Sequence, residues 1–127
     1  MKQKFDIILL EEVWKFFDTL DDKVKDKIIY NIDKSKYVND PEILKKLETD
    51  IWEFRTKYSN LNYRVPAFWD KEDNFETLVV ATHGIIKKTD KVPKKEIEKA
   101  RAIMKRYFEQ KKTISHGKDR KNENIFL

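Results

Sequence analysis

The sequence has no cysteine, two glycines, two histidines and no long apolar run. Without cysteine there is no disulfide framework, thiolate metal site or cysteine nucleophile. Two histidines are too few for a convincing zinc site, and two glycines exclude a glycine-rich phosphate loop. No stretch approaches the ~20 apolar residues of a membrane span, and acidic residues interrupt the start, which makes a poor signal peptide. We expect a cytoplasmic protein without membrane association, metal or cofactor.

What is abundant is charge, and its positive part is unevenly distributed. Charged residues make up 40% of the chain and hydrophobic residues 39%. Residues 83–112 contain eleven Lys or Arg against four Asp or Glu, whereas residues 1–82 contain fourteen against seventeen. Such an asymmetry favours an anionic partner, with nucleic acid first. A basic amphipathic helix that is merely soluble would give the same pattern.

Hydrophobic periodicity predicts one α+β domain over residues 1–112. A chain of 127 residues has room for one modest core. Alternation predicts strands, and three- to four-residue spacing predicts helices; the expected strands are 5–10, 51–58, 61–69 and 76–83, and the expected helices are 11–33, 40–50 and 93–112. The order β-α-α-β-β-β-α favours helices packed on one face of a small antiparallel sheet. Residues 113–127 have no clear period and predict a flexible C-terminal tail.

The chain is organised around a predicted hairpin that turns at Ser59-Asn60, two residue types that suit such turns. The resulting register sets two polar pairs on one face: Arg55 opposite Arg64, and Lys57 opposite Asn62. Like charges directly opposite each other cost roughly 0.2–1 kcal/mol. An anionic ligand is the simplest reason to accept that cost, and a solvated outer face with ordinary surface charge is the alternative.

Several short motifs follow one another at defined spacings between about residues 48 and 108. They are Glu53-Phe54-Arg55, Tyr63-Arg64-Val65, His83-Gly84, Lys87-Lys88-Thr89 and a helix begun by Pro93. This series resembles the RelE/ParE superfamily of type II toxin–antitoxin toxins, in particular its HigB-like branch. The resemblance implies a small RelE-like α+β toxin that is neutralised by an antitoxin, here a helix-turn-helix, HigA-like protein. It also implies an mRNA interferase, a ribosome-dependent endoribonuclease that needs no metal.

In that family the ribose 2′-hydroxyl attacks the adjacent phosphate, and basic residues on the sheet carry the chemistry. The resemblance therefore implies catalytic roles for Arg55, Lys57, Arg64 and His83, and phosphate binding by Lys87, Lys88 and Lys91. His83 is the favoured general base because an imidazole titrates near neutral pH, and Lys57 is the alternative. Preorganised cations aimed at a dianionic transition state contribute on the order of 3–4 kcal/mol each, which exceeds the ~1 kcal/mol of repulsion on the sheet.

Two residues depart from the family pattern, and two other functions fit the same fold. Tyr107 stands where related enzymes often carry a tyrosine that acts on substrate, but its place on the apolar stripe of the last helix favours a core role. Pro66 replaces an aliphatic residue and predicts a local irregularity or a backbone position left free on one side. A ParE-like gyrase inhibitor and a non-catalytic RNA-binding domain are the alternative functions.

Overall fold

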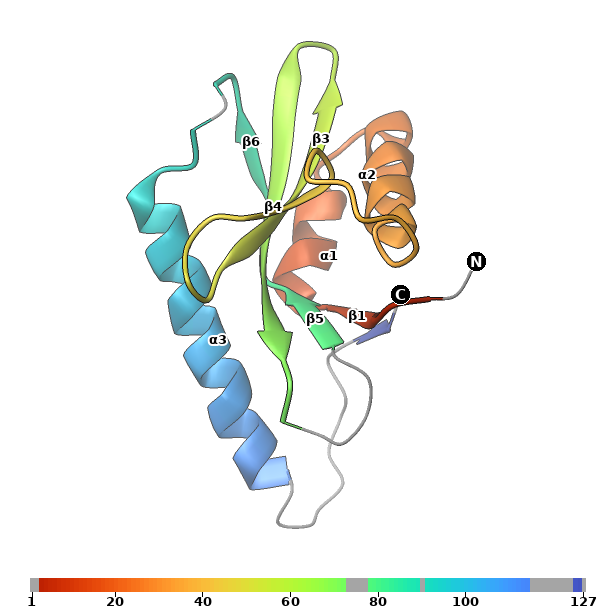
Figure 1. Cartoon of the computed structure of the whole chain (residues 1–127). Helices are drawn as coiled ribbons and strands as arrows, with labels where there is room; N and C mark the ends of the chain where they lie inside the picture. The colour runs from red at the N-terminus through yellow and green to blue at the C-terminus, as the bar shows by residue number, and fades with distance from the viewer. Residues whose placement is uncertain (1–2, 73–77, 90, 115–124, 127) are drawn as a thin grey trace.

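The computed structural model describes residues 3–72, 78–89, 91–114 and 125–126. The elements are β1 Asp6–Leu9, α1 Glu11–Phe17, α2 Asp22–Lys34, β2 Leu44–Lys46, β3 Trp52–Tyr58, β4 Leu61–Asp70, β5 Leu78–Ala81, β6 Ile85–Lys87, α3 Lys94–Ile114 and β7 Ile125–Phe126. The sheet runs in the order β2-β3-β4-β5-β1-β7, and β6 pairs with β4 beside that path. The predicted α+β class is confirmed, with antiparallel pairing throughout except between β1 and β5 (Figure 1).

Helices cover both faces of the sheet, with α1 and α2 on one side and α3 on the other (Figure 1). One core cluster joins Phe17 and Ile28 to Val65, and a second joins Phe68 to the α3 residue Tyr107. This differs from the expected packing of all helices on one face. The reason is that successive residues of a strand point to opposite faces, and Phe68 lies on the face that the basic pairs share. The apolar stripe of α3 covers that part of the face.

Two helix predictions were wrong in their boundaries or their type. The helix expected over 11–33 is two helices, because the polar stretch between α1 and α2 turns, and Thr19 Oγ1 donates to Phe16 O at 2.7 Å. The helix expected over 40–50 is a turn followed by β2. Asp40 caps that turn through the Glu42 N–H, and pairing with β3 then satisfies the backbone of β2.

The central hairpin has the predicted register, with Arg55 opposite Arg64 and Lys57 opposite Asn62. Ser59 and Asn60 have φ values of 49° and 66°, as a two-residue turn between twisted strands requires. The expected irregularity at Pro66 is confirmed in one form: β4 changes partner there, from β6 at residues 62–64 to β5 at residues 67–70. A proline fits this gap because it has no N–H for a ladder.

The last part of the chain is divided differently from the prediction. In place of one strand over 76–83 there are β5 and β6, joined through His83 and Gly84; residues 76 and 77 lie outside the described residues. The final helix begins close to Pro93, as predicted, and runs to Ile114. Of the predicted tail, Ile125–Phe126 pair with β1 as β7, and residues 115–124 and 127 lie outside the described residues.

Candidate nucleic-acid interface

Three polar residues line up across three strands near the tip of the hairpin. Lys57 of β3 pairs with Asn62 of β4, and Asn62 pairs in turn with Lys87 of β6. We call these three residues the basic row. Lys57 is exposed and Lys87 is partly exposed, whereas Asn62 is buried between them. The sheet register therefore sets two accessible cations on either side of one amide.

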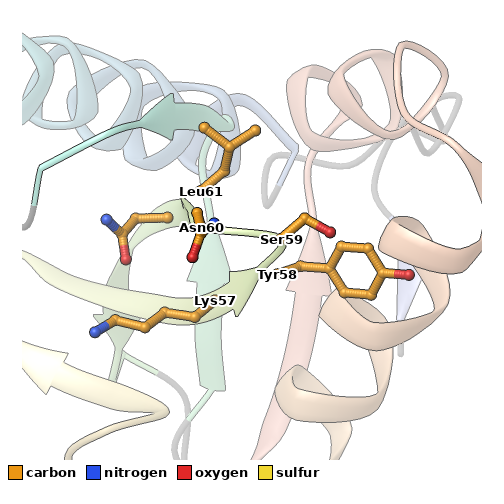
Figure 2. Close-up of a pocket in the computed structure, with 6 residues that line it drawn as sticks. Lys57, Tyr58, Ser59, Asn60 and Leu61 are labelled. Carbon is orange, nitrogen blue, oxygen red and sulfur yellow. The ribbon is translucent and has the colours of Figure 1, made fainter.

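A hollow of about 330 Å³ lies beside this row, lined by Lys57, Tyr58, Ser59, Asn60, Leu61 and Asn62. Figure 2 shows that Lys57 and Tyr58 extend to opposite sides of the strand, so the lysine amine and the phenol do not meet. No carboxylate lines the hollow. The site is therefore polar, open and free of acidic side chains that would repel an anion.

Asn62 is held by the segment that follows β6. Its Nδ2 donates to Thr89 O at 3.3 Å, and this bond fixes the orientation of the amide because a flipped group would set two acceptors against each other. Its Oδ1 has no hydrogen-bond partner among the described residues. Leaving a buried acceptor unsatisfied costs roughly 1–3 kcal/mol, so the position of this amide lowers the stability of the fold.

The arginines of the predicted site are occupied by an internal carboxylate. Glu53 is buried and its Oε2 lies 3.4 Å from Arg64 Nη1 and 3.5 Å from Arg55 Nε. The Arg64 side chain is 2% exposed and that of Arg55 is 21% exposed. A shared carboxylate between two guanidinium groups offsets their repulsion. Arg64 is therefore enclosed, while Arg55 is partly exposed and is not among the residues that line the hollow.

His83 is buried between β5 and β6 rather than at the open row. Its Nδ1 lies 3.0 Å from Thr82 Oγ1 and its Nε2 lies 3.0 Å from Glu96 Oε1 of α3. Burial lowers the pKa of His83 below its usual value; the hydrogen bond that His83 makes to the Glu96 carboxylate opposes this shift, and the nearby Lys99 charge adds to it. A neutral imidazole engaged on both nitrogens is poorly placed to take a proton from a substrate.

The remaining predicted residues separate into an exposed group and a buried one. Lys88 and Lys91 are exposed on the segment after β6, and neither makes an ion pair with another described residue. Tyr107 is 9% exposed and its hydroxyl donates to Asp70 Oδ2 at 2.7 Å. The core role expected for Tyr107 matches this placement. The lysines therefore extend the basic row along one edge of the sheet.

A protein-family model matches most of the chain. The model described as "Phage derived protein Gp49-like (DUF891)" matches residues 15–105. The chain belongs to this Gp49-like family. It is a RelE/HigB-like family associated with the toxins of toxin–antitoxin systems, and the matched region includes the whole basic row. Comparisons with curated proteins and with solved structures gave no match.

Two residues of this site were missed when the sequence was read for function, and each left a signal in the pattern. Glu53 alternates with Arg55 and Lys57, so it had to lie on their face of the sheet. Asn62 had to lie opposite Lys57 once the turn was placed. Within the described ranges, no group of three or more His, Asp or Glu side chains is arranged to hold a metal ion, and no helix has the length and apolarity to cross a membrane.

Proposed function

We propose that this Gp49-like protein is the toxin of a type II toxin–antitoxin pair and cuts messenger RNA at the ribosome. The ribose 2′-hydroxyl would attack the neighbouring phosphate, the bond to the 5′-oxygen would break, and the products would be a cyclic phosphate and a free 5′-hydroxyl. The observation that carries the proposal is the open basic row in a chain whose family is associated with toxins. Its partner would be a helix-turn-helix antitoxin of the HigA type.

The spacing of the row suits a phosphodiester. Opposed residues in neighbouring antiparallel strands have Cα atoms about 4.5–5.5 Å apart, so Lys57 and Lys87 start about 10 Å apart on either side of Asn62. Lysine side chains are long enough for both side-chain nitrogens to approach one phosphate from this separation. Lys87 would stabilise the negative charge of the phosphorane, joined by Lys57 once its neutral amine has taken the proton of the 2′-hydroxyl and become an ammonium, and Lys88 and Lys91 would bind the flanking backbone.

The proton-transfer role moves from His83 to Lys57 in this proposal. His83 is enclosed by Thr82 and Glu96, whereas Lys57 is exposed at the hollow. Geometry comes before pKa in choosing a general base, because the group must reach the proton it abstracts. Arg64 would act as a positioning residue through Glu53, since its guanidinium lies below the surface.

The test is controlled expression of the parent and of single lysine variants in bacteria. The parent should arrest growth and deplete messages from polysomes, and Lys57→Ala and Lys87→Ala should each lose both effects. Lys27→Ala is the matched control, because Lys27 is an exposed lysine on α2, across the sheet from the row. Growth arrest that is equally strong in the Lys57 and Lys87 variants would contradict the proposal.

A non-catalytic RNA-binding role is the second candidate, and the enclosure of His83 favours it. In that case the basic row would contact phosphates and position the protein without cutting the strand. The parent would then block translation while every message remained full length. A ParE-like gyrase inhibitor would instead induce the DNA-damage response, with messages intact.

A further inference from the structure

We propose that Lys45 of β2 binds a second phosphate of the RNA strand whose scissile phosphate lies at the basic row. The inference rests on the proposed function, because it takes single-stranded RNA as the polymer. It assigns a ligand contact to a residue outside the predicted site. It also sets the shortest length of RNA that can use both contacts.

The sheet register brings Lys45 to the face that carries the basic row. Lys45 lies opposite Glu53 in the β2–β3 ladder. Directly opposed residues of neighbouring strands point to the same face, and so do residues two apart along one strand. Lys45 therefore shares a face with Arg55 and Lys57 of β3, although residues 1–82 contain more acidic than basic residues overall.

Lys45 is available to an anion because the carboxylates around it are engaged elsewhere. Its side chain is exposed and makes no ion pair with another described residue. Glu53, which lies opposite it, is buried against the two arginines of the sheet. In the segment that follows β2, Glu48 Oε1 lies 2.8 Å from Arg101 Nη2, and Asp50 Oδ2 lies 3.8 Å from Arg101 Nε. Helix α3 thus compensates the negative charge next to β2.

An arginine that is already engaged separates Lys45 from the basic row. Arg55 lies between Glu53 and Lys57 on β3. Its Nε is 3.5 Å from Glu53 Oε2, and its Nη1 donates to Pro41 O at 3.5 Å. Strand residues four apart are about 13 Å apart, so the Cα atoms of Lys45 and Lys57 lie roughly 14 Å apart. Consecutive phosphates of a single strand lie closer together than this, so an RNA that contacts both lysines passes at least one phosphate over Arg55.

A second contact on the same strand changes how binding depends on RNA length. Once one phosphate is bound at the basic row, the contact with Lys45 forms within the complex and adds affinity. Because both contacts are made to phosphate, the added affinity depends on salt and does not depend on base sequence. Lys45 should therefore strengthen the binding of RNA that spans both positions and leave shorter RNA unaffected.

The test is the salt dependence of binding to 2′-O-methyl oligoribonucleotides, which the protein cannot cut because the proposed cleavage needs the free 2′-hydroxyl. Fluorescence anisotropy gives the affinity for a decamer between about 50 and 200 mM salt. Each phosphate contact to a single strand contributes about 0.7 to the slope of log affinity against log salt. Lys45→Gln should reduce that slope by about 0.7 and weaken binding about two- to fivefold. Lys45→Arg should restore the slope of the parent.

Lys46→Gln is the matched control. Lys46 is the next residue of β2, is also exposed, and lies opposite Trp52, so it points to the other face of the sheet. Both glutamine variants lose one positive charge and therefore change the long-range field of the protein equally. Lys46→Gln should keep the slope of the parent. An equal reduction of the slope in both variants would overturn the inference, because net charge alone would then account for it.

A methylated dinucleotide supplies the second arm, because its single phosphate cannot contact both positions. In an NMR titration, Lys45→Gln should bind the dinucleotide as tightly as the parent does. A loss as large as that seen with the decamer would overturn the inference, and so would a decamer that the parent does not bind. The two proposals fail separately. Lys45-dependent binding without message loss overturns only the endonuclease, and message loss without an effect of Lys45 on the slope overturns only the second phosphate contact.

Discussion

At the scale of single residues, the site depends on which charges reach solvent. The alternation of β3 and β4 correctly placed Arg55, Lys57 and Arg64 on one face. It did not show that Arg64 would be enclosed, because periodicity assigns a face and not a depth. The deciding residue is Glu53, which is buried with Arg64 and takes up its charge. A carboxylate on the same face as a cation cluster is the sequence feature that warns of this outcome.

The Glu53 ion pairs predict a large stability effect. Removing one partner of a buried pair typically costs about 3–5 kcal/mol, because the other charge stays buried without compensation. We expect Glu53→Gln to lower the free energy of unfolding by about 3 kcal/mol, measured by urea denaturation. The control is Glu98→Gln, which changes an exposed carboxylate on α3. A loss below about 1 kcal/mol, the usual value for a surface pair, would show that Glu53 is not needed to compensate Arg64.

His83 predicts a stability change in mildly acidic solution. Its pKa is lowered in the folded protein, first by burial and further by Lys99, against the opposing effect of Glu96 and Glu12. As the pH falls, His83 is therefore protonated in the unfolded chain before it is protonated in the folded protein. The neutral, buried His83 makes its full contribution to the free energy of unfolding above the ordinary pKa of 6.5, and this contribution decreases as the pH drops below that value. The melting temperature of the parent should decrease between pH 7 and pH 5.5, and that of His83→Gln should change less.

The second histidine, His116, is present in both proteins, so its contribution cancels in this comparison.

Glu12 and Asp70 have pKa values below those of ordinary carboxyl groups, and therefore they titrate at a lower pH than the range used for His83. Burial alone would raise their pKa values, but hydrogen bonds from Arg106 to Glu12 and from Lys111 and Tyr107 to Asp70 outweigh it. The stability that the ionised Glu12 and Asp70 side chains contribute to the fold is lost only as the pH falls below their ordinary pKa values of 4.5 and 3.8. If the melting temperatures of the parent and His83→Gln changed equally with pH above pH 5, the predicted role of His83 in the pH dependence would be wrong.

At the scale of elements, strands were predicted well where a local turn fixed their register. They were predicted poorly where pairing with a strand distant in the sequence determined the secondary structure. The β3–β4 hairpin was right in every opposed pair that the sequence reading used, because Ser59-Asn60 sets the register locally. The segment over 40–50 carries helix-start residues, yet it is β2 because the edge of β3 is available to it. Such non-local pairing outweighs a local capping preference, and periodicity alone does not reveal it.

The junction between β5 and β6 predicts the effect of adding one methyl group. A Cβ at Gly84 would overlap the ring of Phe16 from α1, so the helix and the junction approach each other as closely as a glycine allows. We expect Gly84→Ala to lower the free energy of unfolding by about 1–3 kcal/mol, the usual cost of overpacking. The measurement is again urea denaturation.

A double-mutant cycle supplies the control for this contact. If the ring of Phe16 causes the cost, then Gly84→Ala should be less destabilising in a Phe16→Ala background than in the parent, with a coupling of about 0.5–3 kcal/mol. Additive effects of the two substitutions would mean that the strain at Gly84 has another origin.

At the scale of the whole molecule, the basic segment has two tasks. Part of its charge attaches α3 to carboxylates of residues 1–82: Arg101 lies 2.8 Å from Glu48, Arg106 lies 2.6 Å from Glu12, and Lys111 lies 2.7 Å from Asp70. Among the described residues at the hairpin end, Lys87, Lys88 and Lys91 of this segment stay accessible beside Lys57 of β3. The distribution of net charge along the sequence thus predicted a polyanionic partner but not the position of its binding site. That position depends on which cations are engaged in ion pairs within the fold.

The central claim is that the accessible basic row, and not the buried Arg64 and His83, contacts the RNA that is cut. The most direct measurement is the cleavage rate of a defined message on programmed ribosomes, with purified parent, Lys57→Ala and Lys27→Ala. The account predicts products with a cyclic phosphate and a free 5′-hydroxyl, a rate about 10²-fold lower for Lys57→Ala, and an unchanged rate for Lys27→Ala. An uncut message with the parent, or full cleavage by Lys57→Ala, would contradict it.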